Sequence, residues 1–258
     1  MKVRRVMMKK LMILFVLALF GNQKATCWIN TPPWTGSAPI SKEQQEKAKI
    51  WFYNEFGNKS VCISSVGAGK FIQVEDPYGN WEPEYNTWVN SQERFGTLRL
   101  TTMTFAQIKQ LQTTLSKRAI FKVHPSPADW GRYEIGFVSE SRKGNTNASG
   151  NYYYPGGQTL MVNYNLLDTL PEGEKYKALM VKLSGLAAGY YYQSTWLPEV
   201  IEIQQNFVRI RIILQKSNYP NPSTNFYLYR NPFNRLLVKE LTDNLNKANF
   251  QFDIYPIN

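Results

Sequence analysis

Residues 200–214, VIEIQQNFVRIRIIL, indicate the kind of fold more clearly than any other stretch of the chain. In the second half of this stretch every other residue is apolar, which is the pattern of a strand with one face packed in a core. The alternating apolar residues are Val208, Ile210 and Ile212. Gln204-Gln205-Asn206 separates this strand from a second apolar run, so the stretch predicts an antiparallel hairpin. Arg209 and Arg211 would share the other face, as solvated sheet surface or as a small anion-binding stripe.

Short strands joined by turns recur along the rest of the chain. We expect further strands over residues 61–65, 70–75, 97–103, 119–123, 133–139, 159–164 and 250–254. We expect helices over residues 41–57, 104–115, 174–192 and 231–241. Capping residues mark three of the helix starts, namely Ser41 with Gln44, Thr104, and Asn231 before Pro232. This order favours an α+β fold, with a mainly antiparallel sheet and about four helices packed on its faces.

The N-terminus has the pattern of a secretory signal peptide. A basic segment precedes Leu11–Phe20, an unbroken apolar run of ten residues. As a helix this run spans about 15 Å, roughly half the hydrocarbon core of a bilayer, so it fits a signal peptide better than a membrane span. An uncleaved anchor or a buried helix is the alternative. We expect residues 1–25 to be the signal peptide, and the chain to be secreted, periplasmic or held in the cell envelope.

The rest of the chain, residues 26–258, is expected to form a single α+β domain, with a possible subdomain break in the polar, glycine-rich loop 141–158. The 258 residues carry a net charge of +11. Residues 1–25 contain six basic and no acidic residues, so their removal leaves a balance of +5. About half of the basic excess therefore belongs to the leader, and the charge does not indicate a nucleic-acid partner.

Two cysteines, Cys27 and Cys62, are present. In an oxidising compartment they are candidates for a disulfide that ties the mature N-terminus to the first strand. Cleavage after Cys27, or a lipid anchor on it, would leave Cys62 as a free thiol in an apolar strand. All three outcomes stay open from the sequence, although Thr26 and Lys24 fit a lipid-anchor site poorly.

The sequence contains no strong catalytic, metal or cofactor pattern. His124 is the one histidine, which excludes a multi-histidine zinc site, and two cysteines cannot form a Cys₄ site. Residues 64–71 depart from a P-loop at both ends, because Ser64 replaces the first glycine and Phe71 replaces the magnesium-binding Ser or Thr. A Cys62–His124 dyad is formally available, but strand positions for both residues favour a structural role. We expect no cofactor and no metal.

The most suggestive segment for ligand binding is residues 75–88, EDPYGNWEPEYNTW. Aromatic rings stack on sugar rings, and carboxylates accept hydrogen bonds from hydroxyl groups, so this mixture is typical of glycan sites. Its candidate contact residues are Tyr78, Trp81, Glu82, Glu84, Tyr85 and Trp88. Paired carboxylates such as Asp76 with Glu82 or Glu84 are also what glycoside hydrolysis requires. A calcium loop, or a structural loop whose rings cover the core, would use the same residues.

A second aromatic cluster, Tyr152-Tyr153-Tyr154, precedes Pro155-Gly156-Gly157. Tyrosines on a polar, flexible loop are typical of adaptable binding surfaces, and they also occur where proteins touch lipid. Burial of one or two rings is the alternative.

Together these patterns favour an exported, non-enzymatic interaction protein whose partner is an envelope protein or a glycan. Peripheral membrane contact is possible, while a transmembrane span after the leader is not expected, because no later run reaches 18 apolar residues. The alternatives are a secreted carbohydrate-active hydrolase with paired carboxylates and a membrane-active toxin.

Overall fold

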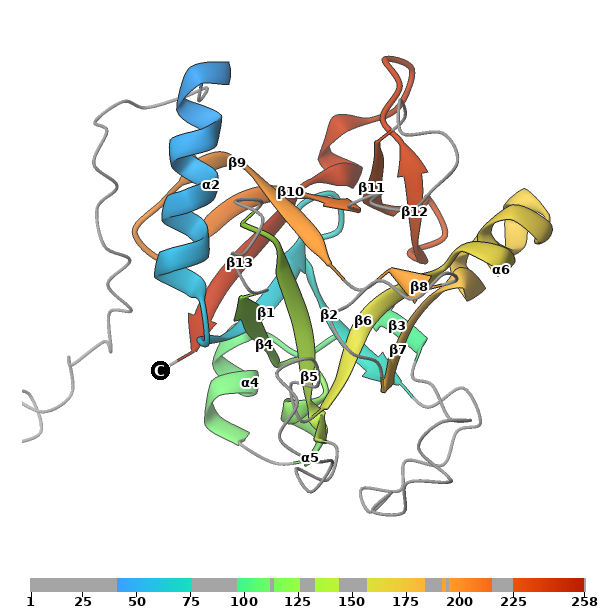
Figure 1. The fold of residues 1–258 in the computed structure, drawn as a ribbon. Helices are drawn as coiled ribbons and strands as arrows, with labels where there is room; N and C mark the ends of the chain where they lie inside the picture. Colours follow the sequence, from blue (N-terminus) through green and yellow to red (C-terminus); the bar gives the residue numbers. More distant parts are fainter. Residues whose placement is uncertain are drawn as a thin grey trace, which may run out of the picture.

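The computed structural model describes residues 41–75, 97–111, 114–125, 133–143, 157–183, 192–193, 195–214 and 225–257. Within these residues the chain forms one sheet of thirteen strands, and every strand pair is antiparallel. Four α-helices and two short 3₁₀ helices accompany the sheet in this part of the chain (Figure 1). This architecture confirms the predicted α+β fold with a mainly antiparallel sheet.

The strands are β1 (Ser60–Ser65), β2 (Lys70–Glu75), β3 (Thr97–Leu100), β4 (Phe121–Pro125), β5 (Ile135–Lys143), β6 (Gly157–Asn163), β7 (Leu179–Leu183), β8 (Tyr192–Gln193), β9 (Trp196–Ile203), β10 (Val208–Leu214), β11 (Phe226–Arg230), β12 (Leu236–Glu240) and β13 (Phe252–Ile257). The helices are α2 (Lys42–Phe56), α4 (Phe105–Leu111), α5 (Thr114–Lys117) and α6 (Tyr164–Thr169), with 3₁₀ helices η1 (Glu172–Ala178) and η2 (Lys247–Phe250).

The predicted capping box starts helix α2. The Ser41 hydroxyl accepts a hydrogen bond from the Gln44 backbone, and the Gln44 side chain accepts one from the Ser41 backbone. At the other end Gly57 is not left-handed, since its φ is −52°, and Asn58 takes that conformation with φ 66°. A Cβ at Gly57 would lie 2.7 Å from the Tyr53 carbonyl oxygen, so glycine is required here by close approach rather than by backbone angle.

The sheet closes on itself through six strands. Strands β10, β13, β1, β4 and β5 follow one another in hydrogen-bonded order. Strand β9 pairs with β10 at seven positions and also meets β5, where Ile135 lies opposite Trp196. The pairing of β9 with both β10 and β5 completes a ring, and a closed ring has no free edge among these six strands.

One hydrophobic core fills the inside of this ring. All six strands contribute buried side chains to it, and helix α2 adds Phe52 and Phe56, whose rings stack at 4.4 Å. Trp196 is fully buried, and its indole N–H donates to the Leu160 carbonyl oxygen at 3.1 Å. Helix α2 is fastened to β9 as well, because the Gln45 amide donates to the Val200 carbonyl oxygen at 2.8 Å.

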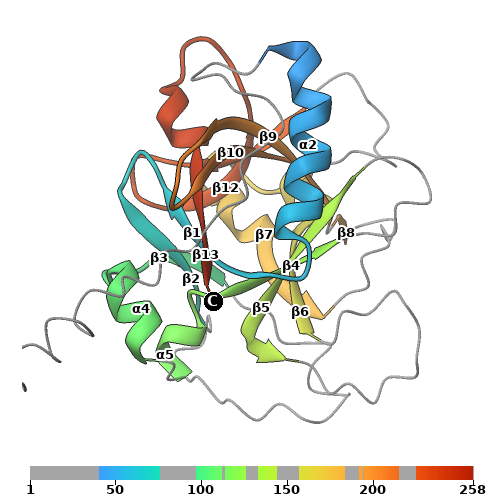
Figure 2. The same ribbon diagram turned by 90° about the vertical axis from the view of Figure 1, so that its left-hand side faces the viewer.

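A smaller core lies on the outer face of β1 and β13. Cys62, Phe71, Ile108 and Ala119 are buried there, and Phe105 of α4 packs against them. Figure 2 shows α4 and α5 on a different side of the sheet from α2. The helices therefore cover more than one face, as the sequence predicted.

The predicted helix over 174–192 is wrong. The described part of this stretch forms the end of η1, then strand β7, which pairs with β6 at five positions, and then β8. Leu179, Met180 and Val181 are all buried, so both faces of β7 are covered. A strand buried on both faces has no alternation in its sequence, and a continuous apolar run does not distinguish such a strand from a buried helix.

The predicted helix over 231–241 is also wrong, because Asn231 starts a hairpin turn between β11 and β12. Its side-chain oxygen accepts hydrogen bonds from the backbone N–H groups of Phe233 at 3.0 Å and Arg235 at 2.9 Å. A helix N-cap uses the same kind of bond, and Asn followed by Pro favours both structures. Asn234 has φ 61°, the left-handed conformation that such a turn requires.

Replacement of Trp196 tests whether the ring closure holds the fold together. We expect Trp196→Ala to lower the free energy of unfolding by about 3–5 kcal/mol, because it leaves a cavity at the β5–β9 junction. Trp196→Phe, the matched control, keeps most of the ring volume and should cost about half as much. Urea unfolding of the two variants measures the difference, and a loss below about 1 kcal/mol for Trp196→Ala would contradict this role.

Candidate functional site

The ligand-binding residues predicted from the sequence lie outside the described part of the chain. They are Tyr78, Trp81, Glu82, Glu84, Tyr85, Trp88, Tyr152, Tyr153 and Tyr154. The same holds for residues 1–40, including the leader and Cys27. The roles assigned to these residues stay predictions.

Cys62 is a free, buried thiol in β1, so the disulfide predicted for it is not present in the structure. Burial raises the pKa of this thiol well above its usual range, which keeps it protonated and unreactive at neutral pH. The thiol is buried because the Cys62 side chain faces the apolar cluster under α4. The alternative of a free thiol in an apolar strand is the one that the structure supports.

The structure also separates Cys62 from His124. Val61 lies opposite Phe121 in the β1–β4 pair, so Cys62 and His124 stand four positions apart along antiparallel strands, about 13 Å. Burial and the neighbouring Lys122 lower the pKa of the half-buried imidazole. These two residues therefore cannot form a nucleophile–base pair.

The outer face of β13, β10 and β9 carries a row of charges. Arg209 donates to both oxygens of Asp253, at 2.8 and 3.2 Å, and to a Glu202 oxygen at 3.0 Å. Asp253 is only 8% exposed, and its hydrogen bonds raise the pKa of Arg209. We call Arg209, Asp253 and Glu202 the charge row.

Arg211 has a similar arrangement two residues further along β10. Both oxygens of Glu199 accept from its guanidinium, at 3.1 and 3.0 Å. The register of β9 against β10 shifts between Arg209 and Ile210, and this shift brings Glu199 and Glu202 to the same face.

The two arginines share a face, as predicted, but carboxylates of the protein occupy both guanidinium groups. Because these carboxylates already take the place that an anion would need, the face is a cross-strand structural element rather than an open anion site.

The hairpin of β11 and β12 carries the most exposed large hydrophobic residue of the described chain. Phe233 is 82% exposed and stands at the turn between the two strands. The turn is fixed by the two hydrogen bonds to the Asn231 side chain and by a backbone bond from Asn231 to Arg235 at 2.9 Å. The turn therefore presents an exposed aromatic ring on an ordered backbone.

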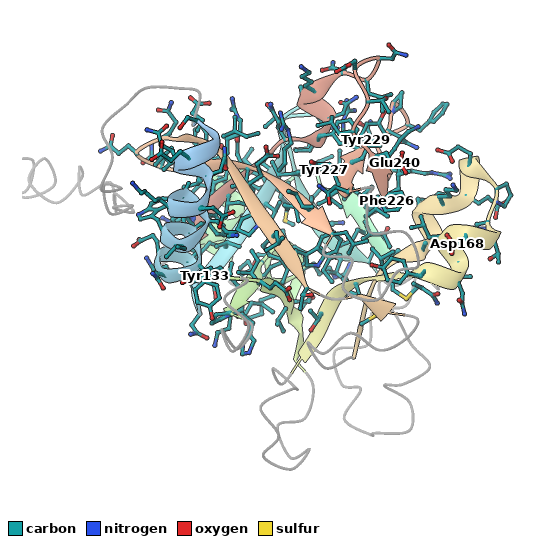
Figure 3. All side chains as sticks on the ribbon, turned by 45° about the horizontal axis from the view of Figure 1, so that its top comes forward. Tyr133, Asp168, Phe226, Tyr227, Tyr229 and Glu240 are labelled. Atoms are coloured by element: carbon teal, nitrogen blue, oxygen red, sulfur yellow. The ribbon has the colours of Figure 1, made fainter. Side chains whose placement is uncertain are left out.

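Aromatic rings and cations lie along this hairpin. Tyr229 packs against Phe250 of η2 with ring centres 4.6 Å apart, and the Lys239 ammonium lies 5.8 Å from the Tyr229 ring centre. The Arg235 guanidinium lies 4.1 Å from the ring centre of Tyr176 in η1, a close cation–π contact. Figure 3 shows the labelled side chains of Phe226, Tyr227, Tyr229 and Glu240 gathered on the hairpin. Tyr133 lies far from them, near α2.

The charges of the hairpin are mostly of one sign. Residues 225–239 contain Arg230, Arg235 and Lys239 and no acidic residue, and Glu240 then ends β12. Arg230 donates to Asn234 at 2.8 Å and to Asn249, and Lys239 lies 3.4 Å from a Glu172 oxygen. Arg235 has no carboxylate at ion-pair distance within the described residues. We call Phe233, Arg235 and Tyr176 the hairpin tip site.

This site was not predicted, because Asn231 followed by Pro232 favours a helix start as well as a turn. Its signal was nonetheless present, since Asn231-Pro232-Phe233-Asn234 separates two runs of five residues, FYLYR and RLLVK. Such a turn between short apolar runs is typical of a hairpin.

The described residues contain neither a metal cluster nor a membrane-spanning helix. No group of three or more His, Cys, Asp or Glu side chains suited to a metal ion occurs among them. No helix in the same part of the chain is long and apolar enough to cross a membrane. No protein family and no curated protein matches the sequence of the chain.

The charge row gives a stability prediction. Arg209→Met would leave the Asp253 carboxylate buried without its partner, so we expect the free energy of unfolding to fall by about 2–3 kcal/mol. Arg211→Met is the matched control and should cost about 1 kcal/mol, because Glu199 is 27% exposed and can be solvated. Adding Asp253→Asn to Arg209→Met should recover part of the loss. Equal losses for the two arginine variants in urea unfolding would show that burial of Asp253 does not set the cost.

Proposed function

We propose that the chain is an exported, non-enzymatic interaction protein that works outside the cytosol. The leader over residues 1–25, with its basic start and ten-residue apolar run, supports export. The partner proposed from the aromatic segments 75–88 and 152–154 is an envelope protein or a glycan. A lipid anchor on Cys27 is a less favoured means of holding the chain in the envelope.

The observation that carries the proposal is the hairpin tip site. Phe233 is 82% exposed on a turn held by side-chain and backbone hydrogen bonds, and Arg235, two residues away, is stacked on Tyr176. Exposing such a ring to water costs free energy that contact with a partner recovers, and aromatic and arginine side chains dominate the energies of binding surfaces. A protein with a preformed contact group of this kind is suited to binding.

The hydrolase alternative has less support. It depends on Asp76 with Glu82 or Glu84, which lie outside the described residues. Three carboxylates on the outer face of the sheet are each held by an arginine, so their oxygens already accept hydrogen bonds within the protein. These are the carboxylates of Glu199, Glu202 and Asp253.

The test expresses the tagged full chain, fractionates the cells, and captures partners from the envelope by chemical cross-linking. We expect the chain outside the cytosol and a discrete set of cross-linked partners. Replacement of Trp81, Trp88 and Tyr153 by alanine should reduce that capture by about tenfold, because each removed ring takes its buried contact area with it.

The thermal unfolding midpoint is the control for this experiment. It should stay unchanged in the triple variant if the rings face a partner. Loss of the folded state would indicate that these rings cover the core, and retention of the intact precursor in the cytosol would contradict export.

A further inference from the structure

We propose that the tip of the β11–β12 hairpin docks on an anionic phospholipid membrane, with Phe233 entering the headgroup boundary and Arg235 binding lipid phosphate. The hairpin tip site supports an interaction function in general; here it is assigned to a membrane surface, while the aromatic segments 75–88 and 152–154 remain the residues proposed for the envelope partner. The inference rests on the proposed function in one respect, since export brings the chain to a membrane surface.

The apolar part of the surface is small and stands at the apex of the turn. Phe233 is the exposed large hydrophobic residue of the described chain, and its neighbours Pro232 and Asn234 are exposed as well. The hydrogen bonds to Asn231 hold the turn, and Asn234 adopts its left-handed conformation in the free protein. A preformed turn loses little conformational freedom on docking, so the transfer of the ring out of water is not offset by ordering the backbone.

The cationic part is close to the ring in the sequence. Arg235 follows Phe233 by two residues and is stacked on Tyr176, which leaves the N–H groups at the edge of its guanidinium as donors. A hydrogen bond to Glu174 raises the pKa of Lys177, and the nearby positive charge of Arg235 opposes this shift. Arg235 therefore lies within electrostatic reach of the Lys177–Glu174 ion pair, and because that pair has no net charge, Arg235 itself supplies the positive charge for an anionic ligand.

The charge of the whole hairpin agrees with this ligand. Residues 226–240, which form the hairpin, carry three basic residues and one acidic residue, Glu240, and the +5 balance of the chain without its leader has the same positive sign. Basic residues near an anionic membrane are attracted to the lipid headgroups over about a Debye length. An apolar apex with cations at its base matches the order of a lipid surface, where phosphates lie above the acyl boundary.

A lipid surface fits these residues better than a pocket in a protein. A stable protein interface buries about 800 Å² on each side and has an apolar centre of several residues. The hairpin tip offers one large exposed apolar side chain, flanked by Asn231, Asn234 and Arg235. One ring with a few cations gives weak, reversible membrane binding, weaker than that of a single myristoyl chain.

Vesicle co-sedimentation tests the proposal. The purified chain, in the form recovered from the cell, is mixed with vesicles of phosphatidylcholine and phosphatidylglycerol in equal amounts or of phosphatidylcholine alone. We expect binding to the anionic vesicles, a loss of about tenfold for Phe233→Ser and of about fivefold for Arg235→Gln. High salt should weaken binding of the unchanged chain.

The β9–β10 turn supplies a matched control. Gln205 is exposed on that turn, where the nearby Arg209 is already paired with Glu202 and Asp253, so Gln205→Phe adds an exposed ring beside an arginine that carboxylates of the protein already hold. Gln205→Phe should not bind the anionic vesicles more strongly than the unchanged chain does. The urea unfolding midpoints of all variants should agree, because positions 205, 233 and 235 are exposed.

Three outcomes would overturn the docking proposal. The first is equal binding to neutral and anionic vesicles, and the second is unchanged vesicle binding by Phe233→Ser. The third is a chain that binds no vesicles but loses partner capture on Phe233→Ser, which would indicate that the ring enters a protein pocket. Each of these leaves export untouched. Retention of the chain in the cytosol would instead refute the proposed function, while the vesicle result would still report on the hairpin.

Discussion

The closure of the sheet at Trp196 is the constraint on which the rest of the structure depends. Strand β9 is hydrogen-bonded along β10, and it completes the six-stranded ring because Trp196 at its start lies opposite Ile135 of β5. The buried indole fills the core at this junction and donates to the Leu160 carbonyl, so its own polar N–H is satisfied away from water. Packing and hydrogen bonding therefore both favour this placement of the Trp196 indole at the β5–β9 junction.

The closed ring positions both outer surfaces described above. With β9 in place, Glu199 and Glu202 lie beside the arginines of β10, so the charge row extends across three strands. Strand β10 then pairs with β11 over its last two residues, which sets where the β11–β12 hairpin leaves the ring. Arg235 packs on Tyr176, so the tip lies against η1. The position of the hairpin tip site is thus a consequence of the core.

Local patterns in the sequence predicted much of this fold. The capping box at Ser41, the strands over 61–65 and 70–75 and the hairpin at Gln204-Gln205-Asn206 depend on neighbouring residues, and all of these are confirmed. Strand β7 was missed because burial on both faces removes the alternation that marks a strand. The turn at Asn231 was missed because the same side-chain bond caps a helix. Closure of the ring joins residues 135 and 196, and no local pattern encodes such a contact; the predicted aromatic segments remain predictions.

Native-state hydrogen exchange tests most directly whether the ring holds the hairpin in a preformed state. The account predicts that backbone amides paired between β10 and β11 and between β11 and β12 exchange only through global unfolding, with the same free energy as the amides of β1 and β13 in the ring. The exchange free energy should also match that of urea unfolding. Rapid exchange of the hairpin amides while β1 and β13 stay protected would contradict this claim, because the closed ring would then leave the hairpin tip disordered.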